Sequence, residues 1–194
     1  MTDLTPSVPS EPARMSVESY FGLAEAGVLA HDDRVELLEG VVVAMTPRNP
    51  LHDSCVTKAT LALVRAVSER AVVRTQCSLI AGRHSVPEPD VAVVPGLPGD
   101  YDSRHPDTAL LVVEVAESSL QQDRITKAAI YAAAGVPEYW IVNLRNGSLE
   151  VMRDPDRSAA RYRDAHNLQA GDRVELAALP GALVAVADLL PEPR

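Results

Sequence analysis

The sequence has few of the features that mark secreted, membrane-spanning or zinc-binding proteins. Only two cysteines occur in 194 residues, Cys55 and Cys77, and neither belongs to a C-x-x-C pair. Two cysteines cannot build a disulfide framework, so we expect buried, reduced thiols in a cytoplasmic protein. No apolar run reaches the ~18 residues needed to cross a bilayer, so we also expect no membrane partner.

The motifs of several enzyme classes are missing as well. The chain contains no G-x-S-x-G nucleophile elbow, no P-loop and no glycine-rich dinucleotide turn. Its five histidines show no zinc-ligand spacing. These absences argue against a serine hydrolase, a P-loop nucleotide hydrolase, a dinucleotide-dependent enzyme and a zinc enzyme.

Positive charge is also scarce. The chain has 18 Lys and Arg against 27 Asp and Glu, a formal net charge of −9, and only two of the cations are lysines. Nucleic-acid-binding proteins usually present a basic surface, so this balance argues against broad, non-specific affinity for DNA. It does not exclude a local site, because a metal-binding acidic cluster adds negative charge and 16 arginines remain for a groove.

The length and the apolar fraction of 46% predict one domain with a proper core. Residues 1–14 are polar and contain three prolines, which predicts a disordered tail rather than a signal peptide and leaves residues 15–194 for the domain. Periodicity and turn residues predict an α+β fold with helices over 16–26, 52–70 and 121–134. Strands are predicted over 34–38, 41–45, 72–75, 77–81, 90–94, 110–116, 138–144 and 149–152, with two or three more between 161 and 187.

A glutamate inside an unbroken apolar run is the most informative feature of the chain. Residues 110–116 have the sequence LLVVEVA, which is typical of a strand buried on both faces, and Glu114 lies within it. An ionised carboxylate there is costly unless it is paired or binds a metal. Asp90 precedes a second apolar strand, and carboxylates on neighbouring strands, ~4.8 Å apart, can share a small hard cation. The alternative for Asp90 is an ordinary strand start after Pro89.

The next helix carries the only lysine near these acids in the sequence. Asp123 and Lys127 are four residues apart and share one face, which Tyr131 extends. Because a short loop joins this helix to the Glu114 strand, Lys127 can return towards that carboxylate and orient an attacking water or stabilise a pentavalent state. An acid four residues before a base is also the favoured surface ion pair, so that alternative stays open. The opposite, apolar face is predicted to pack on the sheet and consists of Ile125, Ala128, Ala129 and Ala132.

Two further polar residues permit both a functional and a purely structural interpretation. Glu36 alternates with Val35 and Leu37 along a strand, a pattern more typical of a solvent-exposed acid than of a site residue. His52 begins the long predicted helix, where a role as N-cap or ordinary surface residue is favoured over that of a ligand.

Taken together, the motifs resemble the Uma-type family of putative restriction endonucleases, a branch of the PD-(D/E)xK nuclease superfamily. The resemblance runs from about residue 16 to 190, and its most specific part is the block GVPEYW joined to D-x-x-x-K. The motifs that carry it are VELLEG at 35–40, His52, Pro89-Asp90, VEVAESS at 113–119, DRITK at 123–127, Tyr131-Ala132 and GVPEYWIV at 135–142.

The resemblance implies a restriction-endonuclease-like fold, a mixed β-sheet flanked by helices. It further implies that Asp90 and Glu114 bind Mg2+ or Mn2+, and that Glu36 is the accessory acid of the cluster. The lysine of the superfamily usually lies two residues after the strand acid, where this chain has Ala116, so Lys127 would supply the amine from the helix instead.

The leading hypothesis is therefore a metal-dependent endonuclease that hydrolyses phosphodiester bonds in DNA, with Glu36, Asp90, Glu114 and Lys127 as its catalytic residues. RNA or a small phosphodiester is a weaker alternative as substrate. The alternative of another class is a catalytically inactive binding or scaffold protein that keeps Glu114 and Lys127 as a buried ion pair. Cleavage of both strands of a duplex is easiest with two sites related by a two-fold axis, so a homodimer is expected.

Overall fold

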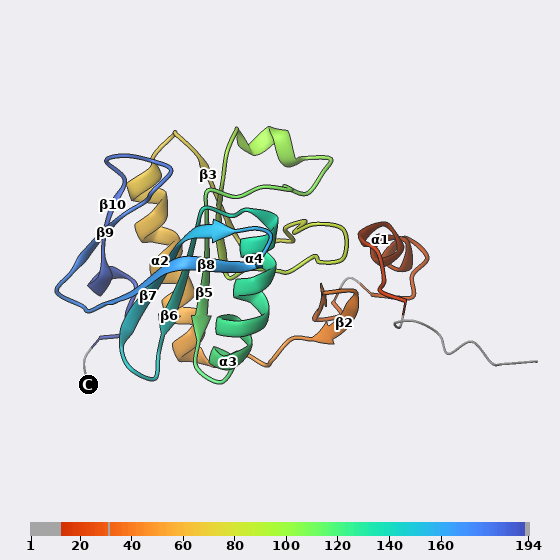
Figure 1. Ribbon diagram of the computed structural model, residues 1–194, viewed down its shortest axis with the longest axis horizontal. Helices are drawn as coiled ribbons and strands as arrows, with labels where there is room; N and C mark the ends of the chain where they lie inside the picture. Colours follow the sequence, from red (N-terminus) through yellow and green to blue (C-terminus); the bar gives the residue numbers. More distant parts are fainter. Residues whose placement is uncertain (1–12, 31, 193–194) are drawn as a thin grey trace, which may run out of the picture.

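A computed structural model describes residues 13–30 and 32–192 of the chain (Figure 1). The tail expected over residues 1–14 therefore lies almost entirely outside the described residues. Within them, no helix is both long and apolar enough to cross a membrane. The elements in chain order are α1 (Val17–Glu25), β1 (Val35–Leu38), β2 (Val41–Ala44), α2 (Pro50–Val67), β3 (Val72–Thr75), β4 (Val91–Val94), a 3-10 turn (Pro98–Tyr101), β5 (Leu111–Ala116), α3 (Leu120–Gln122), a π-helical turn (Asp123–Lys127), α4 (Ala128–Ala134), β6 (Glu138–Asn143), β7 (Ser148–Asp156), β8 (Arg161–Leu168), β9 (Arg173–Glu175), β10 (Leu183–Ala185) and a second 3-10 turn (Val186–Asp188).

The six-stranded main sheet has the order β3-β4-β5-β6-β7-β8. Only β5 and β6 are parallel, and the helical segment between them makes the crossover connection that a parallel pair needs. All other neighbours in this sheet pair antiparallel. The sequence-based prediction of an α+β fold with a mixed sheet is thus confirmed.

Helices cover this sheet on both faces, as the prediction required. α2 buries Ala59 and Leu63 in the larger core cluster, with Val113 and Val115 of β5. α4 buries Tyr131 in a second cluster on the other face, which includes Val112 and other residues of the sheet. Alternate residues of β5 therefore face the helices on opposite sides of the sheet. Glu114 lies on the same side as Val112, where it accepts a hydrogen bond from Tyr131 of α4.

A separate β-hairpin, β1 and β2, stands beside the main sheet together with α1 (Figure 1). Its turn was predicted at Glu39-Gly40, and both residues have positive φ, 53° and 82°, the geometry of a tight primed turn. A single bridge from Leu37 to Val86 links the hairpin to the segment before β4. This contact brings β1, and with it Glu36, towards the acids of the main sheet.

The helix after β5 differs from a regular α-helix, and one residue of the face that was expected to pack on the sheet is exposed. The Ala128 N–H donates to Asp123 five residues back, which makes one wide π-helical turn. This turn changes the angular position of the residues in it, so Ile125 is 62% exposed and the expected apolar packing of that residue is wrong. Ala128 and Ala132 of the predicted face are buried as expected, and Asp123, Lys127 and Tyr131 are buried as well.

The strand predicted over residues 77–81 is also wrong. Gln76 has a left-handed φ of 51°, which ends β3 and turns the chain out of the sheet. The following segment bonds to loops rather than to a strand: Leu79 N–H donates to Pro87, and Ile80 N–H donates to Pro106. The apolar pattern that suggested a strand reflects the burial of Leu79, which is only 1% exposed.

Candidate active site

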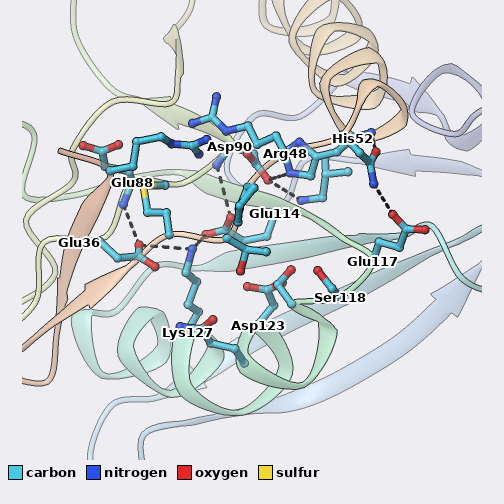
Figure 2. A pocket seen from close by; sticks show the side chains of 18 of the residues that line it. Glu36, Arg48, His52, Glu88, Asp90, Glu114, Glu117, Ser118, Asp123 and Lys127 are labelled. Atoms are coloured by element: carbon cyan, nitrogen blue, oxygen red, sulfur yellow. Dashed lines mark hydrogen bonds and ion pairs between the residues drawn. The ribbon is translucent and has the colours of Figure 1, made fainter. Parts of the chain in front are cut away.

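A cavity of about 80 Å³ lies where β1, the start of α2, the start of β4, the end of β5 and the π-helical turn meet (Figure 2). Its lining is mostly polar and contains all four residues that the sequence singled out: Glu36, Asp90, Glu114 and Lys127. The cavity therefore brings together residues that lie 13 to 91 positions apart in the chain.

Glu114 lines this cavity and is only 3% exposed. One carboxylate oxygen, Oε1, accepts from the Lys127 ammonium at 3.0 Å and from the Tyr131 hydroxyl at 2.8 Å. Burial raises the pKa of Glu114 to about 8, against the opposing effect of the Lys127 charge. The expectation that a mid-strand acid must have a partner is met by these two residues.

Asp90 immediately precedes β4 and faces Glu114 across the sheet. The β4–β5 register pairs Val91 with Val113, so the next position along each strand places Asp90 opposite Glu114. Its Oδ2 accepts from the Val115 N–H at 2.9 Å, and its own N–H donates to Glu114 at 3.4 Å. The predicted adjacency of the two acidic strands is thus present.

Asp90 and Glu114 differ in how readily they ionise, because their pKa values are shifted in opposite directions. Burial alone would raise the pKa of Asp90, but the hydrogen bond and charge of His52, together with the Val115 N–H, hold it below its ordinary value. Asp90 is therefore the carboxylate of the pair that stays ionised most readily.

Lys127 points into the acidic cluster, away from solvent (Figure 2). Its ammonium lies 3.0 Å from Glu114 and 3.4 Å from Glu36. Burial would lower the pKa of Lys127, but the charges of Glu114, Glu36 and Asp123 raise it above the ordinary value, so the ammonium stays charged. The alternative of a surface ion pair is wrong, because both Asp123 and Lys127 are buried.

Asp123 belongs to the cluster through its charge and its burial. It is 2% exposed, and burial raises its pKa to about 6, opposed by the Lys127 charge and a hydrogen bond from Ser119. The ion pairs of Lys127 within the described part of the chain are made to Glu114 and Glu36. Asp123 thus contributes to the field around the ammonium.

Glu36 reaches the cavity from the hairpin and is 4% exposed, so the interpretation as a solvent-exposed strand acid is wrong. Its Oε2 accepts from the Glu88 N–H at 3.2 Å and pairs with Lys127. The alternating pattern of β1 does place Glu36 opposite Val35 and Leu37. The sequence could not show that this side faces the main sheet rather than water.

Three residues of the site were not predicted from the sequence. His52 is not the N-cap of α2, because Asn49 has that position; its ring Nε2 instead lies 3.2 Å from Asp90 Oδ2. Gln76 donates from Nε2 to Asp90 Oδ1 at 3.3 Å, and Arg48 hydrogen bonds to Gln76 Oε1. His52 follows the hairpin at the start of a helix, which was a usable signal, whereas no pattern marks Gln76 or Arg48.

The donor set at the cavity suits a hard cation bound through few protein ligands. Asp90 and Glu114 supply carboxylate oxygens, and Mg2+ usually keeps several waters while one or two carboxylates hold it. Among the described residues, no group of three or more His, Cys, Asp or Glu is arranged to hold a metal ion. Water and substrate would therefore have to complete the coordination of any ion here.

Comparisons with known proteins agree with the fold and the motifs. No curated protein matches the chain. A solved structure described as a putative nuclease belonging to DUF820 from Anabaena variabilis ATCC 29413 is similar with a TM-score of 0.68, covering 86% of this chain and 96% of that one. At 16% sequence identity, this similarity shows a shared fold. A family model described as Uma2, putative restriction endonuclease, matches residues 17–187. The chain therefore belongs to the Uma2 family of putative restriction endonucleases, as its motifs predicted.

Proposed function

We propose that this protein is an endonuclease that hydrolyses phosphodiester bonds in DNA and depends on Mg2+ or Mn2+. The observation that carries the proposal is the meeting of two strand acids, Asp90 and Glu114, with a buried lysine in one polar cavity. Family membership supports the nuclease class, and the metal dependence and the DNA substrate are inferred from the residues.

In this proposal, Asp90 and Glu114 hold the cation, and Glu36 completes the acidic cluster directly or through water. The bound ion would lower the pKa of a coordinated water and neutralise charge that develops on the phosphate. Asp90 fits this role because its carboxylate stays ionised. Glu114 fits because the positive charge of an ion would offset the burial that raises its pKa.

Lys127 has a separate role in the proposal. Its ammonium is charged, buried and fixed by Glu114 and Glu36, so it can orient the attacking water or stabilise the pentavalent phosphate. Such a preorganised donor is worth more among buried side chains than at a surface. Tyr131 holds the same Glu114 oxygen and thereby limits where the ammonium can lie.

Nicking of a supercoiled plasmid tests this function. Wild type with Mg2+ or Mn2+ should nick the plasmid, whereas Glu114→Ala, Lys127→Ala and an excess of EDTA should each abolish nicking. Lys58→Ala is the matched lysine control, because Lys58 bonds to Leu190 outside the cavity, and the exposed Glu69→Ala is the matched acid control. Nicking at the wild-type rate in Glu114→Ala, in Lys127→Ala or in the presence of EDTA would contradict the proposal.

A catalytically inactive scaffold is the second candidate, and one observation favours it. Lys127 already pairs with both Glu114 and Glu36, so the cluster has internal ion pairs without any cation. In that case, the ion pairs would serve conformational specificity. Calorimetry separates the two candidates, because a scaffold should give no heat of Mg2+ or Mn2+ binding at millimolar metal.

The proposed substrate also bears on assembly and location. We propose one nuclease domain over residues 15–194 that acts as a homodimer in the cytoplasm, since duplex cleavage is simplest with two-fold related sites. Sedimentation tests the dimer. Oligonucleotide substrates of DNA and RNA, compared at equal concentration, test the choice of nucleic acid.

A further inference from the structure

The carboxylate of Asp90 is held at both oxygens by groups from three separate segments of the chain. Gln76 Nε2 donates to Oδ1 at 3.3 Å. The Val115 N–H donates to Oδ2 at 2.9 Å, and His52 Nε2 lies 3.2 Å from the same oxygen. Such a set of donors leaves the carboxylate little rotational freedom.

This restraint matters because Asp90 shares its cavity with Glu114, Glu36 and Asp123. Like charges so close favour a rotamer in which one carboxylate turns away from the others. Val115 alone could not prevent such a turn around the side-chain bonds of Asp90. The side chains of His52 and Gln76 oppose it from two directions.

His52 is placed by a well-anchored helix start. Its N–H donates to the side chain of Asn49, the N-cap of α2, at 2.9 Å. Asn49 in turn donates to Glu117, in the loop after β5, at 2.6 Å. These two bonds tie the start of α2, and with it the backbone of His52, to the segment after β5.

Gln76 is held just as firmly, through its backbone and its amide. Its N–H donates to the Asp90 carbonyl at 3.1 Å, and its left-handed φ of 51° is rare for a residue other than glycine. The amide can lie only one way round, since the guanidinium of Arg48 only donates and the ionised carboxylate of Asp90 only accepts. Arg48 therefore orients the side-chain amide of Gln76, and this amide in turn orients the carboxylate of Asp90.

We propose that His52 and Gln76 are positioning residues that hold Asp90 in its cation-binding orientation, with Arg48 fixing Gln76. That the ligand is a cation rests on the proposed function. The restraint of the Asp90 side chain rests on the contacts described above. Outer groups that hydrogen-bond a metal-ligating residue typically change metal affinity or activity about 10–100-fold when they are removed.

The test uses variants that remove one donor and keep the shape of the side chain. His52→Phe keeps a ring, Gln76→Met keeps the length, and Arg48→Met acts from the loop before α2 without touching the core. His52→Gln restores a donor at similar reach. The matched controls are His84→Phe, whose imidazole bonds to the Met15 carbonyl, and the exposed Gln169→Met. Thermal denaturation establishes that each variant is folded.

The first readout needs no cation. The Val115 amide proton donates to Asp90 Oδ2, so its NMR chemical shift and its exchange rate report where the carboxylate lies. We expect a shift change and faster exchange in His52→Phe and Gln76→Met, a smaller change in Arg48→Met, and wild-type behaviour in His52→Gln and both controls. A merely structural role of His52 would not be rescued by glutamine.

The second readout is the affinity for Mn2+, measured by calorimetry. The dissociation constant should rise about 10-fold or more in His52→Phe and Gln76→Met. The double variant should lose less than the product of the two single losses, because both changes act on one carboxylate. Wild-type values of both readouts in folded His52→Phe and Gln76→Met would overturn the proposal. If wild type binds no Mn2+, the proposed function fails, and the Val115 amide alone decides whether the positioning role holds.

Discussion

Lys127 and Glu114 meet in a 3.0 Å ion pair although one comes from a helical turn and the other from the middle of the sheet. The superfamily position two residues after the strand acid is occupied by Ala116, which is fully buried against the same helical segment. The ammonium enters the cavity from the π-helical turn instead. One buried cation faces Glu114, Glu36, Asp90 and Asp123, so the cluster keeps an excess of negative charge.

Lys127→Met should abolish cleavage and leave the affinity for Mn2+ unchanged or higher. Methionine keeps the aliphatic stem, while loss of the ammonium removes the repulsion between two cations. Because Glu114 and Glu36 lose their partner, the metal-free variant should be less stable by about 3–5 kcal/mol. Added Mn2+ should restore much of this loss, since it binds only the folded state.

Plasmid nicking, calorimetry and thermal melts with and without Mn2+ check this prediction, with Lys58→Met as the control. Residual cleavage near the wild-type rate would mean that Lys127 is only a structural counter-ion.

The stability of the metal-free protein should fall as pH rises from about 5 to 8. Burial raises the pKa of Glu114 from 4.5 in the unfolded chain to about 8, so the folded state binds its proton more tightly. The resulting stabilisation is complete below the unfolded pKa and is lost as pH rises through the folded pKa. The raised pKa of Asp123, about 6, acts in the same direction.

Glu114→Gln isolates this effect, because glutamine keeps an acceptor for Lys127 and Tyr131 but never ionises. In EDTA, its stability relative to wild type should increase by at least about 1 kcal/mol between pH 5 and pH 8. Urea denaturation at a series of pH values measures the difference, and Glu69→Gln provides an exposed control. Parallel pH profiles of Glu114→Gln and wild type would contradict the assignment.

Binding of DNA should require a divalent cation. The cavity is lined by acids, and the chain carries a net charge of −9, so a polyanion is repelled until a cation neutralises part of the cluster. Fluorescence anisotropy of a labelled duplex with Lys127→Met, which should not cleave it, can compare Mn2+ with EDTA. Equal affinity in both conditions would place the DNA contacts away from this cavity.

A second buried acid, Glu138, should affect stability without affecting the site. It is fully buried, and its carboxylate accepts from the Trp140 indole at 2.9 Å, from the Arg153 guanidinium at 2.6 Å and from the Ala177 N–H at 2.7 Å. Removal of the only cation in this set leaves a buried charge unpaired, so Arg153→Met should cost about 3–5 kcal/mol.

None of these residues lines the cavity, so the Mn2+ affinity of folded Arg153→Met should equal that of wild type. The exposed Arg161→Met is the control for loss of an arginine as such. A lowered Mn2+ affinity in Arg153→Met would show that the two buried networks are coupled.

The sequence predicted the parts of this protein that depend on local pattern. The apolar runs predicted the central strands β4, β5 and β6, and a charged residue inside such a run pointed to Glu114. The exposure of Ile125 was not predicted, because it results from a π-helical turn. Such a turn depends on how the helix packs against the sheet, and hydrophobic periodicity does not encode this packing. The burial of Glu36 was likewise invisible in its own strand, since it comes from contacts of the hairpin with the rest of the molecule.

The contacts around Asp90 show the same limit. Val115, His52 and Gln76 approach this residue from β5, α2 and the end of β3, and only the tertiary arrangement brings them together. A lone histidine at a helix start is more often a cap, and a glutamine after a short strand carries no signal.

The cavity is built from distant segments of the chain. One of them is the hairpin of β1 and β2, which forms a two-stranded sheet of its own beside the main sheet. A small apolar cluster of Val17, Tyr20, Leu37 and Val86 holds this hairpin in place. Opening of that cluster would withdraw Glu36 from Lys127 while the six strands stay intact. Under the proposed function, a chain whose hairpin is undocked therefore lacks its full acidic cluster and should cleave no DNA.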